Sequence, residues 1–195
     1  VDTDIVIVGA GGAGMTAAIT AAAEGKSVVI VESQPMVGGN TVRATGGMNA
    51  AKTERQDANT FGEQAGLEKT LAAVETTWTD NAAIVELAKT VKAQWEEYQK
   101  NPVGYFDSME LMQLDTIIGG KGINNPELVK VLAENSAEGV EWLRNYNIFL
   151  DNTGAFGGAS VNRIHWPKVD GKKTNVGSYM IPLLKEACDA NENIT

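Results

Sequence analysis

The sequence predicts an α/β fold that opens with a β–α–β unit, on three observations. Apolar, β-branched runs cover residues 4–8 and 27–32. Between them lies an alanine-rich run of high helix propensity, from about Gly12 to Glu24. Glycines in G-x-G-x-x-G spacing connect the first run to this helix. The order strand, tight turn, helix, strand is that of a Rossmann-like unit, whose crossover is nearly always right-handed.

The glycine turn predicts a site for a dinucleotide pyrophosphate. Gly9 allows the turn, Gly11 lets the backbone approach the phosphates, and Gly14 lets the helix lie close to the strand. The helix N-terminus adds unpaired N–H groups and a partial positive charge. Glu32 ends the second strand 18 residues after Gly14, where a carboxylate accepts hydrogen bonds from an adenosine ribose. A glycine turn without a ligand is the alternative, and Glu32 favours the nucleotide site.

The bulk composition limits the class of partner. With 195 residues, the chain fits one domain or one and a fraction. Its 25 acidic and 16 basic residues give a net charge of −9 without a basic cluster, which disfavours nucleic acid. One cysteine, Cys188, and one histidine exclude an intrachain disulfide and CxxC or multi-histidine metal sites. No run of about 20 apolar residues is present. Composition therefore favours a small-molecule ligand.

A glycine-rich stretch over residues 33–50 follows the second strand. It holds two Gly-Gly pairs, Gly38-Gly39 and Gly46-Gly47. Such pairs weaken a helix or a central strand, whereas they suit a backbone that lies flat against a planar ligand. Polar side chains that could bind a ligand stand between the pairs: Asn40, Thr41 and Thr45. A plain flexible loop is the alternative interpretation.

The segment over residues 57–147 is predicted to be mostly helical. One helix, capped by Asp80, carries an apolar stripe at helical spacing: Ile84, Leu87, Ala88, Val91, Trp95 and Tyr98. Asn125-Pro126-Glu127 is a strong start for a later helix. We expect its buried face to comprise Leu128, Val131 and Leu132, and another helix to begin near Ser136.

A glycine-rich loop over residues 154–167 contains Arg163 and the single histidine, His165. Arginine matches a carboxylate bidentately, and histidine can add a hydrogen bond or a proton. A surface ion pair or a hydrogen-bonded structural histidine accounts for them equally well. The chain then forms a helix from Ser178 to about Ala190 and ends at what reads as the opening of a third strand, so it looks truncated.

Taken together and in this order, the motifs resemble the soluble fumarate reductase flavoproteins, the flavocytochrome c branch of the fumarate reductase/succinate dehydrogenase family. The matching segments are residues 8–14 with Glu32, 38–41, 46–50, 119–129 and 158–165. The resemblance implies a Rossmann-like FAD-binding domain, incomplete, with a helical insertion. Residues 1–195 would be its N-terminal part: a βαβ unit (4–32), an FAD-lining loop (33–50), the helical segment and the Arg/His loop. The family's capping domain and C-terminal FAD segment would be absent.

The family reduces the C=C bond of an α,β-unsaturated carboxylate, with FAD as the hydride donor. The resemblance and the glycine motif together give the residues expected to bind FAD: Gly9, Gly11, Gly12, Ala13, Gly14, Glu32, Ser33, Gly39, Asn40, Thr41, Thr45, Gly46 and Gly47. Gly46 and Gly47 would also border the substrate. The family's proton-donor arginine and substrate-clamping residues come after residue 195, so no catalytic residue and no metal ligand is assigned in this chain.

The implied function is therefore an FAD-dependent oxidoreductase, with fumarate to succinate as the first candidate reaction. A sibling reductase acting on urocanate or an acrylate-like acid and a non-catalytic flavin-binding fragment are the alternatives. An NAD-dependent dehydrogenase is disfavoured because simple NAD sites give the Gly38–Gly47 region no role. The electron donor (haem, an FMN domain or NADH) and a cytoplasmic or exported location stay open.

Overall fold

The computed structural model describes residues 2–58, 65–155 and 157–195, so part of the predicted helical segment, residues 59–64, lies outside the described residues, as does Phe156. The chain divides into two compact units. Unit 1 comprises residues 1–47, 142–150 and 166–195, and unit 2 comprises residues 48–141 and 151–165. Within the described ranges, no helix combines the length and the apolar character needed to span a membrane.

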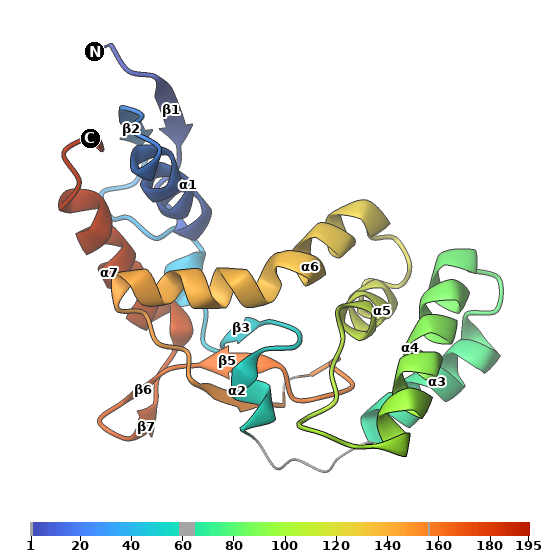
Figure 1. Cartoon of the computed structure of the whole chain (residues 1–195). Helices are drawn as coiled ribbons and strands as arrows, with labels where there is room; N and C mark the ends of the chain where they lie inside the picture. The colour runs from blue at the N-terminus through green and yellow to red at the C-terminus, as the bar shows by residue number, and fades with distance from the viewer. Residues whose placement is uncertain (1, 59–64, 156) are drawn as a thin grey trace. The chain divides into compact units, whose positions relative to one another are not determined.

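Unit 1 is built on the predicted β–α–β unit. Strands β1 (Ile5–Val8) and β2 (Val28–Val31) pair in parallel, with Ile5 opposite Val28 and Val8 opposite Val31. Helix α1 (Gly12–Ala23) connects them and lies against both strands (Figure 1). Gly25 has a φ of +77° just after the helix, a left-handed conformation that costs glycine little. The sequence therefore located these elements to within one residue.

The C-terminal part of the chain completes unit 1. A hairpin of β6 (Lys168–Val169) and β7 (Lys172–Lys173) precedes helix α7 (Val176–Asp189), which contacts α1 and the short 3-10 helix η1 (Thr41–Arg43). A second 3-10 helix, η2 (Arg144–Tyr146), also contacts α7. Helix α7 starts two residues before the predicted Ser178. Ile194 bridges Val28 in parallel, so the predicted third strand begins beside β2.

Three helices form the apolar core of unit 2: α3 (Ala65–Thr77), α4 (Ala82–Lys100) and α5 (Met109–Gly119). Helix α4 contacts both of the others (Figure 1). Its predicted stripe faces this core: Ile84, Ala88, Val91 and Trp95 are buried, and Leu87 and Tyr98 pack against them. Its N-cap is Asn81, whose side chain accepts from the Ile84 N–H, one residue later than the predicted Asp80.

Helix α6 (Pro126–Leu143) corrects two expectations. It is one continuous helix, without the break expected near Ser136. Leu128, Val131 and Leu132 are 68%, 58% and 53% exposed, whereas Val129 and Ala133 are buried. The helix carries apolar residues on more than one face, so the 3.6-residue period alone cannot select the buried face. Ser136 belongs to the buried face because its hydroxyl donates to the Ala133 carbonyl and accepts from the Ala51 N–H.

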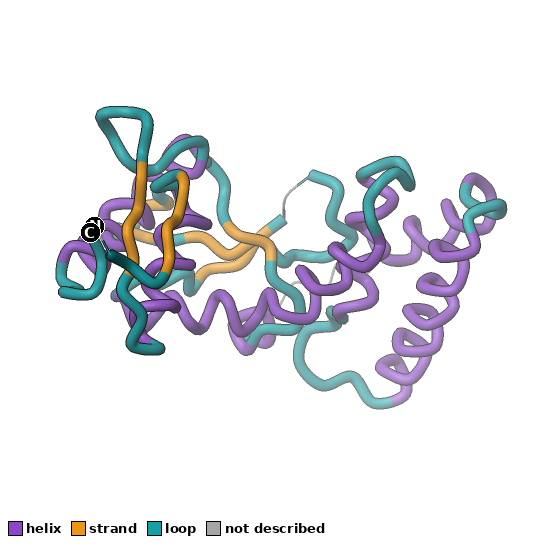
Figure 2. The backbone as a smooth tube through the Cα atoms, turned by 90° about the horizontal axis from the view of Figure 1, so that it is seen from above, coloured by secondary structure: helices purple, strands orange, loops and turns teal. Residues whose placement is uncertain are grey.

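A small three-stranded sheet lies outside the helices of unit 2. Its order is β3 (Met48–Asn49), β5 (Ile164–Trp166), β4 (Asn152–Gly154), with β3 antiparallel to β5. The single-turn helix α2 (Glu54–Asp57) follows β3 and starts with a capping box formed by Thr53 and Gln56. Figure 2 draws these short strands in orange among the purple helices.

Candidate functional site

The turn between β1 and α1 needs glycine at two positions for reasons internal to the chain. Gly9 has a φ of +105°, which L side chains rarely adopt. At Gly14, a Cβ atom would lie 1.9 Å from the Gly9 carbonyl oxygen. The backbones of the turn and the helix therefore meet in direct contact, as the motif requires.

Gly11 differs, because nothing inside the chain requires glycine there. Its φ of −81° is open to any residue, and a Cβ would meet only the Gly38 carbonyl oxygen, at 3.8 Å. An alanine would fit there, so contacts among the described residues do not explain the glycine. Gly11 is the N-cap of α1 without a side-chain cap, and the first turn carries no acidic residue. This arrangement fits a phosphate, which binds to the N–H groups and positive end of a helix.

Glu32 connects the end of β2 to this turn. Its carboxylate accepts hydrogen bonds from the backbone N–H groups of Gln34 (2.9 Å) and Ala10 (2.8 Å), one at each oxygen. These bonds, from Gln34 first and then Ala10, hold the pKa of the half-exposed Glu32 carboxyl below its ordinary value. Because each carboxylate oxygen can accept more than one hydrogen bond, the ionised side chain keeps acceptor capacity for a ribose hydroxyl.

The glycine-rich loop folds back onto the same turn. The Gly38 N–H donates to the Ala10 carbonyl at 2.7 Å, and the Thr41 hydroxyl accepts from the Gly12 N–H at 3.3 Å. The turn, Glu32 and the Gly39–Thr41 segment therefore lie together in unit 1. The side chains of Asn40 and Thr45 are exposed, which leaves them accessible to a ligand.

Helix α7 fixes the second half of the loop, which the sequence did not reveal. The Gly177 N–H donates to the Ala44 carbonyl at 3.0 Å, and the Val176 N–H donates to the Gly46 carbonyl at 3.4 Å. A Cβ at Gly177 would lie 2.1 Å from the Thr41 carbonyl oxygen. Gly177, one residue before the predicted start of this helix, is the only signal that could have indicated this contact.

All the residues predicted to bind FAD lie in unit 1, within residues 9–47. Sequence reasoning missed Ala10 and Gln34, because their contribution is a backbone N–H that any residue supplies. Cys188 is buried in the same unit, as expected, and burial raises the pKa of its thiol. Among the described residues, no group of three or more His, Cys, Asp or Glu side chains is arranged to hold a metal ion.

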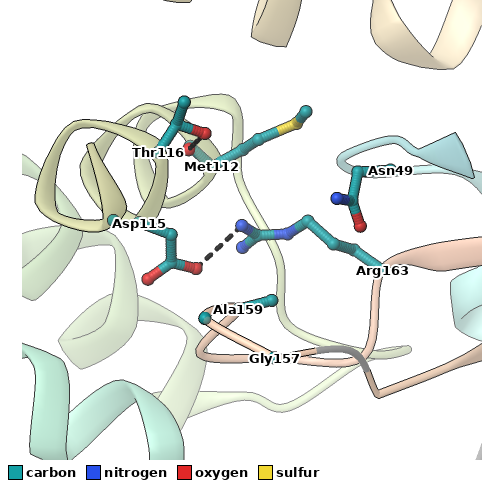
Figure 3. A pocket seen from close by; sticks show the side chains of 9 residues that line it. Asn49, Met112, Asp115, Thr116, Gly157, Ala159 and Arg163 are labelled. Atoms are coloured by element: carbon teal, nitrogen blue, oxygen red, sulfur yellow. Dashed lines mark hydrogen bonds and ion pairs between the residues drawn. The ribbon is translucent and has the colours of Figure 1, made fainter. Parts of the chain in front are cut away.

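In unit 2, Arg163 is buried between two aspartates. Its Nε and Nη2 atoms donate to the two carboxylate oxygens of Asp107 at 3.2 and 2.7 Å, and Nη1 donates to Asp115 at 2.8 Å. Arg163 and Asp115 of α5 both line a pocket of about 200 Å³, and Figure 3 draws the bond between them. Burial raises the pKa of Asp115, opposed chiefly by the charge of Arg163. Since three of its N–H groups already bind carboxylates, Arg163 presents no free fork to a substrate carboxylate.

His165 is fully buried and hydrogen-bonded at both ring nitrogens. Nδ1 lies 2.9 Å from the Arg163 carbonyl oxygen, and Nε2 lies 2.7 Å from the Thr53 hydroxyl. A carbonyl can only accept, so Nδ1 carries the proton and Nε2 accepts from Thr53. Burial lowers the pKa of His165 below its ordinary value of 6.5, which keeps the ring neutral. Of the two alternatives, the surface ion pair is excluded, because the ion pairs of Arg163 are buried.

Comparison with known families identifies the class of the chain. A family model described as "FAD binding domain" matches residues 4–107, just over half of the sequence. The match includes the glycine turn, Glu32 and the loop with both Gly-Gly pairs. The chain belongs to this FAD-binding domain family, and FAD is its cofactor.

Relatives with names connect the chain to a particular group of flavoproteins. It is 36% identical to "Fumarate reductase (cytochrome)" from Shewanella frigidimarina over 93% of this chain and 24% of that protein. It is 38% identical to "NADH:acrylate oxidoreductase" from Vibrio harveyi over 85% of this chain and 18% of that protein. The open conformation of a flavocytochrome c3 fumarate reductase superposes with a TM-score of 0.70 and 29% identity, over 98% of this chain and 26% of that one.

These matches confirm the fumarate reductase resemblance and the Rossmann-like FAD-binding fold. The chain spans about a quarter or less of the length of these three proteins.

Proposed function

We propose that this chain supplies the N-terminal, FAD-binding part of a reductase that saturates the C=C bond of an α,β-unsaturated carboxylate. Fumarate, reduced to succinate, is the first candidate substrate. The observation that carries the proposal is the N-terminus of α1, where Gly11 has no side-chain cap and, among the described residues, a Cβ would meet only the Gly38 carbonyl oxygen, at 3.8 Å. The fumarate reductase relatives supply the reaction class.

The residues of unit 1 fit FAD along its length. The N–H groups at the start of α1 (Gly11, Gly12, Ala13 and Gly14) would hold the pyrophosphate, and Glu32 with Ser33 would hold the ribose. The later loop residues would border the ribityl chain and the ring: Gly39, Asn40, Thr41, Thr45, Gly46 and Gly47. When bound and reduced, FAD supplies a hydride from N5 to one alkene carbon, while the other carbon takes a proton.

This chain's own residues bind and orient, and a proton donor has to come from elsewhere in the full-length protein. Arg163 is held by Asp107 and Asp115, and His165 is buried and neutral. We therefore expect the 195-residue chain alone to bind flavin weakly and to have no reductase activity.

The choice of substrate is the least constrained part of the proposal. The Vibrio harveyi relative is named for acrylate, which favours an acrylate-like acid as the second candidate, and urocanate is a third. A non-catalytic flavin-binding role of the isolated chain is the alternative from a different class. Haem, a second flavin or NADH would supply the electrons that reduce FAD. Anaerobic respiration is the metabolic setting consistent with fumarate as the substrate.

The experiment compares two preparations, the 195-residue chain and the full-length protein that contains it. Each is loaded with FAD, reduced with viologen dye, and offered fumarate, acrylate and urocanate in turn. We expect dye oxidation only with the full-length protein and fastest with fumarate. Turnover of another acid alone would change the substrate, and a flavin-loaded full-length protein that reduces none of them would refute the reductase. Replacing the dye with NADH then tests the direct donor.

A further inference from the structure

The Gly46-Gly47 turn leads directly into strand β3, and β3 is bound to the segment that contains Arg163 and His165. Met48 lies opposite His165 in the antiparallel pair, and Asn49 lies opposite Ile164. One residue further on, the Ala50 N–H donates to the Arg163 carbonyl at 3.1 Å. The backbone directly after Gly47 is therefore held by the 163–165 segment.

That segment is in turn fixed by the charged side chain of Arg163. Two parallel bonds join its guanidinium to Asp107, and a third joins it to Asp115 of α5. A planar fork bound at both ends restricts rotation as well as distance. Asp115 is further bound to the Ser160 backbone N–H at 2.9 Å and to the Ser160 hydroxyl, so the loop before β5 is held by the same carboxylate.

The carbonyl of Arg163 joins these bonds to a second set. It accepts from both the Ala50 N–H and the Nδ1–H of His165, while the His165 Nε2 accepts from the Thr53 hydroxyl. Thr53 is the N-cap of α2, three residues beyond Ala50. The Arg163 carbonyl therefore holds the segment at Ala50 directly and at Thr53 through the imidazole of His165.

Stability alone does not explain the buried ion pairs of Arg163 with Asp107 and Asp115. Ion pairs buried in this manner contribute little compared with apolar side chains of equal volume, and their best-attested benefit is a single fixed register. The three strongest bonds of Arg163 all serve to fix one short strand beside the Gly46-Gly47 turn.

We propose that Arg163 and His165 are positioning residues that hold β3, the strand directly after Gly47, through β5, and so set the rate of hydride transfer without touching substrate. The placement of this turn beside the flavin ring and substrate rests on the function proposed above. The role is distinct from substrate clamping or proton donation, for which neither side chain is free.

The test uses the full-length flavoprotein with Arg163→Lys, which keeps the charge and loses the fork. Val91→Ala is the matched control, since it makes a cavity in the α3–α4–α5 core of the same unit and removes no hydrogen bond of this network. Hydrogen exchange at the Ala50 amide should be about tenfold or more faster in Arg163→Lys and unchanged in the control. Single-turnover oxidation of the reduced flavin by substrate should slow about tenfold to a hundredfold, because small misplacements are costly in rate. Substrate affinity should change less than threefold.

His165 offers a second test in case Arg163→Lys fails to fold. The amide of His165→Asn can still donate to the Arg163 carbonyl, whereas His165→Leu cannot. We expect the asparagine variant to keep most of the Ala50 protection and of the hydride-transfer rate, and the leucine variant to lose both.

Two results would overturn the inference. One is unchanged Ala50 exchange and unchanged hydride transfer in folded Arg163→Lys and His165→Leu proteins. The other is an equal slowing in Val91→Ala, which would mean that general loss of stability is the cause. If the wild-type protein binds FAD yet reduces no unsaturated acid, the function proposed above fails, while Ala50 exchange still tests whether Arg163 and His165 hold β3.

Discussion

Glu32 in unit 1 and Arg163 in unit 2 differ in exposure and in hydrogen-bond partners. Glu32 in unit 1 is half-exposed and binds two backbone N–H groups, so its carboxylate keeps further acceptor capacity. Arg163 in unit 2 is 2% exposed, and its N–H groups bind Asp107 and Asp115 of the same chain. Glu32 can still accept a hydrogen bond from a ligand, whereas Arg163 is already paired with carboxylates of its own chain.

This difference distinguishes residues that bind a ligand from residues that hold the fold together, although both kinds lie in clear sequence motifs. A glycine without an internal reason, as at Gly11, and an ionised carboxylate with spare lone pairs indicate a ligand. A motif whose polar groups are all used inside the chain indicates a structural device. The following predictions test the distinction.

The largest expected effect is on stability when the buried cluster is broken. Arg163→Met leaves Asp107 and Asp115 buried without their cation, which should lower the free energy of unfolding by about 3–5 kcal/mol. Urea unfolding of the FAD-free protein measures it. Lys89→Met is the control, because the Lys89–Glu86 pair is exposed and such pairs contribute about 0–1 kcal/mol. Equal losses in both variants would contradict the structural role of the buried Arg163 cluster.

Two glycines of one turn should behave differently. Gly14→Ala forces a Cβ against the Gly9 carbonyl oxygen and should lower the free energy of unfolding by about 1–3 kcal/mol. Gly11→Ala should leave stability unchanged and weaken FAD binding by about 1.4 kcal/mol or more, a tenfold rise in Kd. Thermal unfolding and flavin-fluorescence titration of the full-length protein measure the two effects. Normal FAD affinity in Gly11→Ala would show that the pyrophosphate does not bind beside Gly11.

An effect of similar size is expected from the ribose contact. Glu32→Ala should weaken FAD binding by about 1–3 kcal/mol, because hydroxyl and N–H groups lose their acceptor. Calorimetry with FAD measures it. Gln34→Ala keeps the backbone N–H that Glu32 binds and should bind FAD normally. Unchanged affinity in the Glu32 variant would show that the ribose assignment is wrong.

The smallest effect concerns pH and belongs to unit 2. Burial keeps His165 neutral in the folded state, with Arg55 opposing and Asp107 favouring its charge. The unfolded chain therefore binds a proton more readily once pH falls below about 6.5, so stability should decrease as pH is lowered through that range. Urea unfolding at pH 7.5 and 5.5 measures the loss, which should be smaller in His165→Asn. Identical pH dependence in both proteins would contradict the buried neutral state.

Much of unit 1 follows from local chemistry. The β-branched runs, the alanine-rich helix and the glycine spacing predicted β1, α1 and β2, and Glu32 lies beside the turn as the motif implies. Local patterns were weaker guides in α6, where Leu128, Val131 and Leu132 are exposed although the spacing suggested burial. A helix with apolar residues on several sides has no unique buried face until its neighbours are in place.

The sequence by itself determined the glycine turn, because its residues are close together in the chain. It also determined the family and the cofactor, because the motifs occur in one order along the chain. Only the tertiary structure decided what Arg163 and His165 do. Their partners Thr53, Asp107 and Asp115 are 48 to 112 residues away in the sequence, and no spacing rule joins them. It likewise revealed that α7 binds the glycine-rich loop at Ala44 and Gly46, since those contacts use backbone groups that every residue carries.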